Sequence, residues 1–325
     1  MNFAGISAMA PEADSLQYAL SLLERHFAER TVAVDGGVVS YREIAAAPAA
    51  AGVPSTSATL SAAQSAAQPA TTKAATTAAT IVLLHGIGSG AASWLPCALE
   101  LAAAAPGSRV IAWNAPGYGN STVLAAARPG AEAYAARLRQ LLQALGVLDS
   151  GRFVLVGHSL GAMMASAYAA AHPATLDKLV LLSPARGYGQ AARLEQGAQV
   201  ARERLSTVGE LGVHGMATQR SSRLLSGNAS TAQRDWVRWN MAQLNLPGYT
   251  QAVHLLCGDA IENYALSGAV CAVASVHCGS ADNVTPPADC RLVAEHHGLP
   301  FALIDQAGHA CYVEQPLAAA AAILN

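Results

Sequence analysis

The chain has 325 residues, of which 52% are hydrophobic and 12% are charged. It is long for one compact domain, so an insertion within a larger fold is expected. Lysine and arginine number 19 against 21 aspartates and glutamates, and they form no basic cluster of the kind that nucleic-acid binding requires. Because no apolar run approaches about 18 residues, the sequence also excludes a transmembrane segment.

The N-terminus and the cysteines both favour a cytoplasmic protein. Residues 1–5 (Met-Asn-Phe-Ala-Gly) lack the basic start of an export signal, and no sustained apolar segment follows them. The six cysteines include no Cys-x-x-Cys pair and are interpreted as reduced thiols. We therefore expect no metal and no cofactor, and no membrane or nucleic-acid partner; the oligomeric state is left open.

The chain before residue 80 contains a helix, a hairpin and a low-complexity segment. Apolar residues at helical spacing predict an amphipathic N-terminal helix within residues 1–30. Alternating residues on either side of Asp35-Gly36-Gly37 predict a hairpin of strands 31–34 and 38–41. Residues 45–79 reduce almost to Ala, Ser, Thr, Gln and Pro, which predicts a disordered loop without chemistry.

Beyond this loop, short apolar runs alternate with helical patterns. Uniformly apolar strands separated by helices predict a mostly parallel sheet flanked by helices on both faces. Residues 31–186 would form the first part of this core. Its expected strands are 81–84, 109–113, 153–156 and 178–182, and its expected helices are 91–105, 131–145 and 160–171.

The alternation stops after the sixth strand and later resumes. Residues 187–267 have a helical pattern with no convincing strand, which predicts a helical cap inserted into the sheet. Residues 268–325 would complete the core. Strands are expected at 271–278 and 301–304, and helices at 288–297 and 317–324.

The most informative segment is a buried strand that runs through Gly157-His158-Ser159-Leu160-Gly161 into a helix of small residues. Gly-x-Ser-x-Gly between a strand and a helix is the context of a nucleophile elbow. Such a sharp turn holds the serine hydroxyl against a helix N-terminus, where free N–H groups favour developing negative charge. Ser159 is therefore the candidate nucleophile; the bland alternative is a glycine-rich turn with a helix-capping serine.

With this segment the chain resembles the alpha/beta-hydrolase superfamily from about residue 31 to the C-terminus, apart from the low-complexity loop. His85-Gly86-Ile87-Gly88 is similar to the family's oxyanion loop. Residues 114–121 (Asn-Ala-Pro-Gly-Tyr-Gly-Asn-Ser) are similar to its Asp-x-x-Gly-x-Gly-x-Ser turn, with Asn114 in place of the usual aspartate. The resemblance implies the alpha/beta-hydrolase fold and a serine hydrolase with a catalytic triad.

The candidate base and acid also follow from the chemistry of a serine nucleophile, which needs an imidazole that a carboxylate orients. His309 follows the strand 301–304 by a short loop and should lie at the edge of the sheet where Ser159 points. Asp282 follows the strand 271–278 and stands between the two in chain order. Asp289 and Asp305 remain weaker alternatives for the acid.

Two backbone N–H groups are the candidate oxyanion donors. They belong to Leu160, directly after the nucleophile, and to Ile87 in the loop after the first buried strand. The rival interpretation of residues 86–91 is a dinucleotide-binding glycine loop. It is disfavoured because the next strand ends in Asn114, where an acidic ribose ligand would be expected.

These assignments predict a serine hydrolase that cleaves a small carboxylic ester, thioester or lactone through an acyl-enzyme. The expected partner is a small molecule with an apolar acyl group, because the cap sequence offers Trp236, Trp239, Met216 and Met241 for an apolar face. Hydrolysis of a carbon–carbon bond in a ring-cleavage product is the nearest alternative, although Ala310 stands where such enzymes commonly have tryptophan. An acyltransferase, a perhydrolase and a non-catalytic ligand-binding protein on the same fold are the others.

Overall fold

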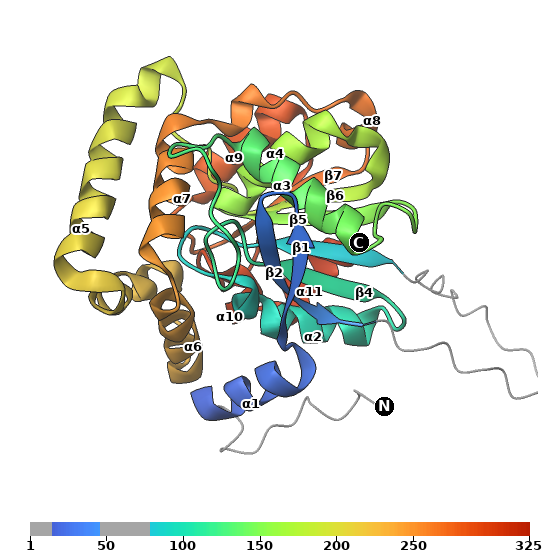
Figure 1. Ribbon diagram of the computed structural model, residues 1–325, viewed down its shortest axis with the longest axis horizontal. Helices are drawn as coiled ribbons and strands as arrows, with labels where there is room; N and C mark the ends of the chain where they lie inside the picture. The colour runs from blue at the N-terminus through green and yellow to red at the C-terminus, as the bar shows by residue number, and fades with distance from the viewer. Residues whose placement is uncertain (1–14, 46–78) are drawn as a thin grey trace, which may run out of the picture.

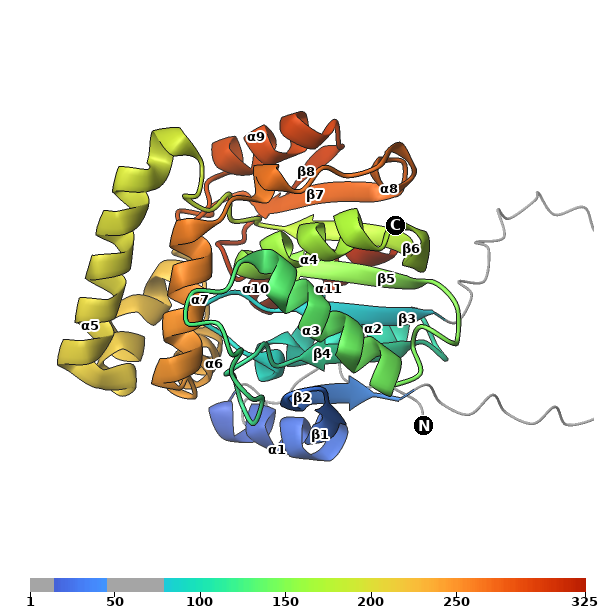
Figure 2. The ribbon, with the colours of Figure 1, turned by 45° about the horizontal axis from the view of Figure 1, so that its top comes forward.

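A computed structural model describes residues 15–45 and 79–325 of the chain. Its centre is one eight-stranded sheet in the order β1-β2-β4-β3-β5-β6-β7-β8 (Figures 1 and 2). The predicted disordered loop at residues 45–79 falls almost entirely outside the described residues. The strands are β1 Glu29–Val34, β2 Gly37–Ile44, β3 Thr80–Leu84, β4 Arg109–Trp113, β5 Phe153–His158, β6 Leu176–Leu182, β7 Ala274–Gly279 and β8 Phe301–Ile304.

Six of these strands run parallel to one another. The pairs from β4 through β3, β5, β6 and β7 to β8 are all parallel, whereas β1 pairs with β2, and β2 with β4, in the antiparallel sense. The apolar character of β3, β4, β5 and β6 follows from this arrangement, because a parallel strand covered by helices is buried on both faces. The predicted fold class, an alpha/beta-hydrolase fold with a mostly parallel sheet, is confirmed.

Alternate residues of β3, β4, β5 and β6 supply two separate cores. In β4, Ile111 and Trp113 face one core, whereas Val110 and Ala112 face the other. The first core is closed by α3 (Ala131–Ala144), α4 (Leu160–Ala171) and α9 (Pro287–His297). The second is closed by α1 (Leu16–His26), α2 (Leu95–Ala104), α10 (Cys311–Glu314) and α11 (Pro316–Leu324).

Three long helices stand in the chain between β6 and β7: α5 (Leu194–Arg220), α6 (Thr231–Ala242) and α7 (Leu246–Gly258). We refer to them as the inserted helices. Figure 2 shows them together at one end of the strands. Within α5, Gly212 has φ 66° and ψ 176°, so the helix is kinked at this residue. A residue with a side chain rarely adopts this conformation, which explains the glycine.

Several predicted elements differ at their ends: the strand expected at 153–156 ends at His158, and the one expected at 178–182 begins at Leu176. In two further cases a contact explains the difference. The strand expected at 271–278 begins at Ala274, because Ser267 caps a short helix, α8 (Gly268–Cys271), by accepting a hydrogen bond from the Val270 N–H. The hairpin is longer than expected: β1 begins at Glu29, which pairs with Arg42. Both differences lie at element ends, where a single cap or pairing contact decides the boundary.

Candidate active site

Ser159 occupies a turn between the central strand β5 and the helix α4. Its backbone has φ 53° and ψ −116°, which is unusual for a residue with a side chain. The Ser159 N–H donates to the carbonyl of Leu182 on the neighbouring strand β6 at 3.0 Å. The strain is therefore held in place by the sheet, and the serine stands at the N-terminus of α4.

The two glycines of the motif are required by close backbone approach. A Cβ at Gly157 would lie 2.5 Å from the carbonyl oxygen of Gly161. A Cβ at Gly161 would lie 2.5 Å from the carbonyl oxygen of Leu84 on β3. Any side chain at either position would therefore push α4 away from the sheet and displace Ser159.

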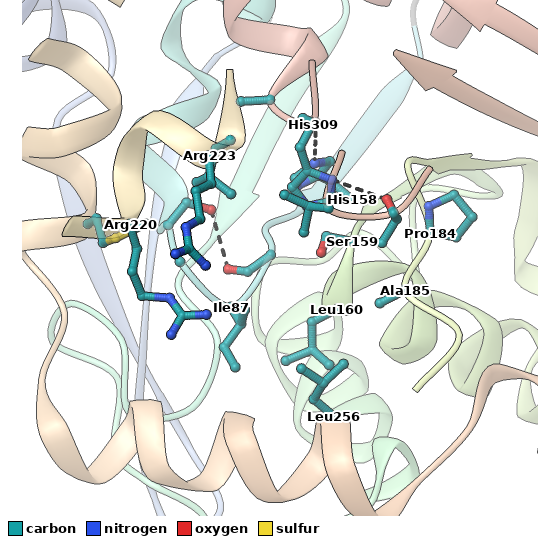
Figure 3. Close-up of a pocket in the computed structure, with 18 of the residues that line it drawn as sticks. Ile87, His158, Ser159, Leu160, Pro184, Ala185, Arg220, Arg223, Leu256 and His309 are labelled. Atoms are coloured by element: carbon teal, nitrogen blue, oxygen red, sulfur yellow. Dashed lines mark hydrogen bonds between the residues drawn. The ribbon is translucent and has the colours of Figure 1, made fainter. Parts of the chain in front are cut away.

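The structure brings Asp282 and His309 together in the core. Asp282 Oδ2 lies 2.9 Å from His309 Nδ1, and both side chains are almost fully buried. Asp282 follows β7, and His309 lies in the loop between β8 and α10. This loop also brings His309 to the cavity that Ser159 lines (Figure 3).

Hydrogen bonds keep the Asp282 carboxylate ionised. Burial by itself would raise the pKa of this carboxyl, but the neighbouring His309 ring and the N–H groups of Thr285 and Val284 stabilise the charged form and hold the pKa well below its usual range. A carboxylate at this position accepts the Nδ1–H of the imidazole. The tautomer that results leaves Nε2 of His309 to accept a proton.

The loop after β3 is fixed by a neutral histidine. Nε2 of His85 accepts from the Ala115 N–H at 3.0 Å, so Nδ1 carries the proton and donates to the carbonyl of Gly86 at 2.8 Å. Burial lowers the pKa of His85 to about 4, which keeps the ring neutral. Ile87, which follows Gly86, is held through its carbonyl, which accepts from the hydroxyl of Tyr118 at 3.0 Å. The loop thus has a defined shape where it lines the cavity.

The side chain of His158, beside the serine in sequence, contacts the loop that holds His309. Its Nε2 lies 2.9 Å from the carbonyl oxygen of His309 and donates to it (Figure 3). Burial and the neighbouring His309 lower the pKa of His158 to about 3, so the ring is neutral. His158 therefore links the turn of Ser159 to the backbone of His309.

The His309 loop is also joined to the segment between α5 and α6. The Ala310 N–H donates to the carbonyl of Leu224 at 2.7 Å. The buried carboxylate of Glu314 accepts from the Gly308 N–H at 2.7 Å and from the Ser226 hydroxyl at 2.6 Å. One carboxylate thus connects the loop of the candidate base to the inserted helices.

Asn114, where the family resemblance leads one to expect aspartate, makes three side-chain hydrogen bonds at the end of β4. Its Oδ1 accepts from the Ala91 N–H at 2.8 Å, while its Nδ2 donates to Glu29 Oε1 at 3.0 Å and to the Ser40 hydroxyl at 2.9 Å. The packing around this amide is close, because a Cβ at Gly119 would lie 2.3 Å from Asn114 Nδ2. Because Glu29 already places a carboxylate here, an amide is the group that fits.

A cavity of about 450 Å³ lies between the C-terminal ends of the strands and the inserted helices. Besides Ser159 and His309 it is lined by both candidate oxyanion residues, Ile87 and Leu160. Its apolar lining includes Leu224, Val237, Met241 and Leu256 of the inserted segment, together with core residues such as Ile87, Leu160 and Val313. The sequence analysis missed the arginines that also line it: Arg186, Arg193, Arg204, Arg220 and Arg223. Their approach depends on the packing of the inserted helices, for which the sequence holds no local signal.

Two further findings concern residues 15–45 and 79–325. No group of three or more His, Cys, Asp or Glu side chains in these ranges is arranged to hold a metal ion. None of the helices within them has both the length and the apolar character needed to cross a bilayer.

The fold, the strained serine and the paired Asp282 and His309 are features of one enzyme superfamily. The model of the alpha/beta hydrolase family matches residues 81–323, and the chain belongs to this family. The resemblance expected from the sequence is thus confirmed. The family is defined by its fold and embraces several kinds of hydrolase.

Individual relatives differ in activity. A 2-hydroxy-6-oxononadienedioate/2-hydroxy-6-oxononatrienedioate hydrolase of Burkholderia vietnamiensis is 37% identical over 108 residues, which are 33% of this chain and 36% of that protein. Among solved structures, an enol-lactonase from Burkholderia xenovorans LB400 has a TM-score of 0.68 at 18% identity and covers 90% of this chain and 97% of its own. A thermophilic esterase from Thermogutta terrifontis has a TM-score of 0.65 at 20% identity, with 92% and 96% covered. These structures share the fold.

Proposed function

We propose that the protein is a serine hydrolase that cleaves a carboxylic ester, thioester or lactone through an acyl-enzyme. The observation that carries this proposal is the buried Asp282–His309 pair, of which His309 lines the same cavity as a serine held in a strained turn. A turn that serves packing alone has no need of an oriented imidazole beside its hydroxyl. Family membership and the esterase and enol-lactonase of the same fold support hydrolysis.

In the proposed mechanism Ser159 attacks the carbonyl carbon of the substrate. His309 takes the serine proton on Nε2 and returns it to the leaving group, while Asp282 holds Nδ1–H and stabilises the imidazolium that forms. Water, activated by the same imidazole, then hydrolyses the acyl-enzyme. The low pKa of Asp282 keeps the carboxylate charged throughout the cycle.

We assign the oxyanion hole to the backbone N–H groups of Ile87 and Leu160. Leu160 is the first residue of α4, so its N–H has no carbonyl partner one turn earlier in the helix. Ile87 lies in the loop that His85 and Tyr118 hold. Donors fixed before the reaction stabilise the tetrahedral intermediate without reorganisation.

We further propose that residues 187–267 act as a cap over the site. Val237, Met241 and Leu256 of the inserted helices form part of the apolar cavity wall, and an acyl chain would pack there. Of the cap residues singled out from the sequence, Met241 lines the cavity. Trp236 instead packs in the core, where its indole N–H lies 3.5 Å from the carbonyl of Ser93.

A second candidate function is hydrolysis of a carbon–carbon bond. Its support is the similarity of about a third of the chain to dienedioate hydrolases. The same serine, histidine and oxyanion donors would serve such a reaction. Assays of a dienol keto-acid in parallel with esters and lactones separate the two candidates, because each reports product formation directly.

The proposal is tested with a fluorophosphonate probe and a panel of p-nitrophenyl esters of increasing length. We expect the wild-type protein to be labelled and to turn over at least one ester or lactone. Ser159→Ala should abolish both while hardly changing Tm, because the lost hydroxyl has no packing role. Ser166→Ala, a buried serine within α4, is the matched control and should remain labelled. Turnover by Ser159→Ala above a few per cent of wild type would show that another residue is the nucleophile.

A further inference from the structure

Three arginines reach the cavity from one part of the inserted segment. Arg204 and Arg220 belong to α5, and Arg223 belongs to the short helical turn that follows it. Figure 3 shows Arg220 and Arg223 on one side of the cavity, with Ile87 between them and Ser159. The arginines therefore lie on the same cavity as the nucleophile but away from it.

These three guanidinium groups lack the acidic partners that other cavity arginines have. Arg186 and Arg193 both pair with Glu262 at 2.8 Å. No ion pair to Arg204, Arg220 or Arg223 is present within residues 15–45 and 79–325. The Nε of Arg204 is buried without a hydrogen-bond partner, and its Nη1 has a 3.5 Å contact to the hydroxyl of Tyr249.

The surroundings of Arg220 show that this positive charge is not neutralised. Burial and then the like charge of Arg204 lower the pKa of Arg220, and Arg223 lowers it further, while Tyr249 and Glu203 act in the opposite direction. Asp289 is the acidic residue that lines the cavity, and its side chain is exposed. A cluster of positive charge in a partly enclosed site attracts an anion.

We propose that Arg204, Arg220 and Arg223 bind a carboxylate at the end of the substrate that is remote from the bond cleaved. The inference rests on the proposed function, which places the scissile carbonyl at Ser159. It adds a charged end to the apolar acyl substrate predicted from the sequence. The planar fork of arginine matches the two oxygens of a carboxylate, and the apolar wall formed by Leu224 and Met241 suits the chain between the two ends.

The carboxylate could be carried by the acyl group or by the leaving group, and matched substrates separate these cases. For the acyl side, p-nitrophenyl adipate monoester is compared with the corresponding adipamide, in which a neutral amide replaces the carboxylate. For the leaving-group side, p-(carboxymethyl)phenyl hexanoate is compared with its carbamoylmethyl counterpart. We expect kcat/KM to favour the carboxylate about tenfold or more in one of the two pairs.

Substitution of the arginines should remove this preference. Arg220→Gln and Arg204→Gln are expected to lower kcat/KM for the favoured carboxylate substrate about 10- to 100-fold and to leave its amide counterpart within about twofold. Arg202→Gln is the matched control, because Arg202 is an exposed residue of the same helix that does not line the cavity. Equal rates for both members of each pair, or equal losses on both in the arginine variants, would overturn the proposal.

A binding measurement keeps this inference separate from the proposed function. Ser159→Ala protein is titrated with adipate and with adipamide by calorimetry, alone and combined with Arg220→Gln. Adipate binding that is lost with Arg220→Gln supports the arginine site even if the wild-type protein hydrolyses no ester, in which case the proposed function fails. Active ester hydrolysis without arginine-dependent adipate binding or charge preference overturns the arginine site and leaves the proposed function intact.

Discussion

The buried polar residues around Ser159 combine one charged carboxylate with rings that are held neutral. Burial keeps His85 and His158 uncharged, with pKa values of about 4 and about 3, whereas the pKa of Asp282 is held low. A positive charge that forms on His309 therefore faces Asp282 without competition from a second imidazolium. In the proposed mechanism, this arrangement favours transfer of the serine proton to His309.

The assignment of the acid is tested by Asp282→Asn. The amide can hold the imidazole in the wrong tautomer, and in serine proteases the equivalent loss costs about 10⁴ in kcat. We expect a loss of that order in steady-state assays. Asp289→Asn and Asp305→Asn are the controls and should cost less than about tenfold, because both side chains are exposed. If Asp282→Asn keeps most of its kcat while a control variant loses it, the acid is misassigned.

Asn114 offers a test of why this chain departs from the family's aspartate. Asn114→Asp replaces the donor to Glu29 with a second carboxylate, so we expect the free energy of unfolding at neutral pH to fall by about 1–3 kcal/mol. Denaturant titration measures the change. Adding Glu29→Gln restores a donor and should recover most of the loss. Additive losses in the double variant would mean that the two residues are not coupled.

At the scale of single residues, the sequence predicted the candidate triad but not the cavity arginines. Ser159, Asp282 and His309 each follow a strand, and the ends of parallel strands meet at one edge of a sheet, so sequence order and spacing suffice to place them together. Their catalytic roles remain predictions. Arg204 and Arg220 stand on a surface-exposed helix pattern, where arginine is ordinary. Their convergence on the cavity depends on how α5 packs and bends.

Among the elements, α5 shows how a single residue shapes the cavity wall. Its kink at Gly212 separates the part that carries Arg204 from the part that carries Arg220. A Cβ at Gly212 would meet nothing within 4 Å, so space is not what requires glycine there. The requirement is the backbone conformation alone.

Gly212→Ala is therefore expected to destabilise the protein by about 1–3 kcal/mol. It should also lower kcat/KM for the favoured carboxylate substrate, because a helix that straightens shifts Arg220. Thermal unfolding and steady-state kinetics measure the two effects. Gly209→Ala, one turn earlier in helical conformation and also with open space around it, should be neutral or slightly stabilising. A Gly212→Ala protein as stable and active as Gly209→Ala would show that the kink is not set by this glycine.

The sequence predicted the order and the type of the helices and strands better than the residues at which they begin and end. Apolar runs identified the buried strands because burial on both faces leaves little choice of residue. The start of β7 was misplaced because Cys271 and its neighbours are as apolar in α8 as they would be in a strand. The helix is distinguished from a strand by its N-cap, the hydrogen bond that the Ser267 hydroxyl accepts.

At the scale of the whole molecule, the sheet brings the two ends of the low-complexity segment together. Ile44 of β2 and Ile81 of β3 both pair with Val110, one from each side of β4. Two strand spacings, or about 10 Å, therefore separate them. A short connection of a few residues reaches that far, since an extended chain covers about 3.3 Å per residue.

Deletion of residues 49–75 should accordingly leave the fold and kcat nearly unchanged. Closing a shorter loop costs less entropy, by about 0.6 kcal/mol for each halving of its length, so a small gain in stability is expected. Tm and kcat of the deletion variant are compared with those of the full chain. A large loss of solubility or of kcat would mean that the segment contacts the inserted helices or a partner.

The carboxylate of Glu314 would couple movement of the segment from Leu224 to Ser226 to the position of the His309 loop. A conformer in which the segment from Leu224 to Ser226 lifts away to admit substrate must give up the Ala310–Leu224 hydrogen bond and the Ser226 donors of Glu314. The same carboxylate accepts from the Gly308 N–H, next to His309, so loss of the Ser226 contacts would weaken the support of the candidate base. Under the proposed function, the conformer with this segment lifted would be inactive. Closure of the segment over bound substrate would return His309 to its catalytic position.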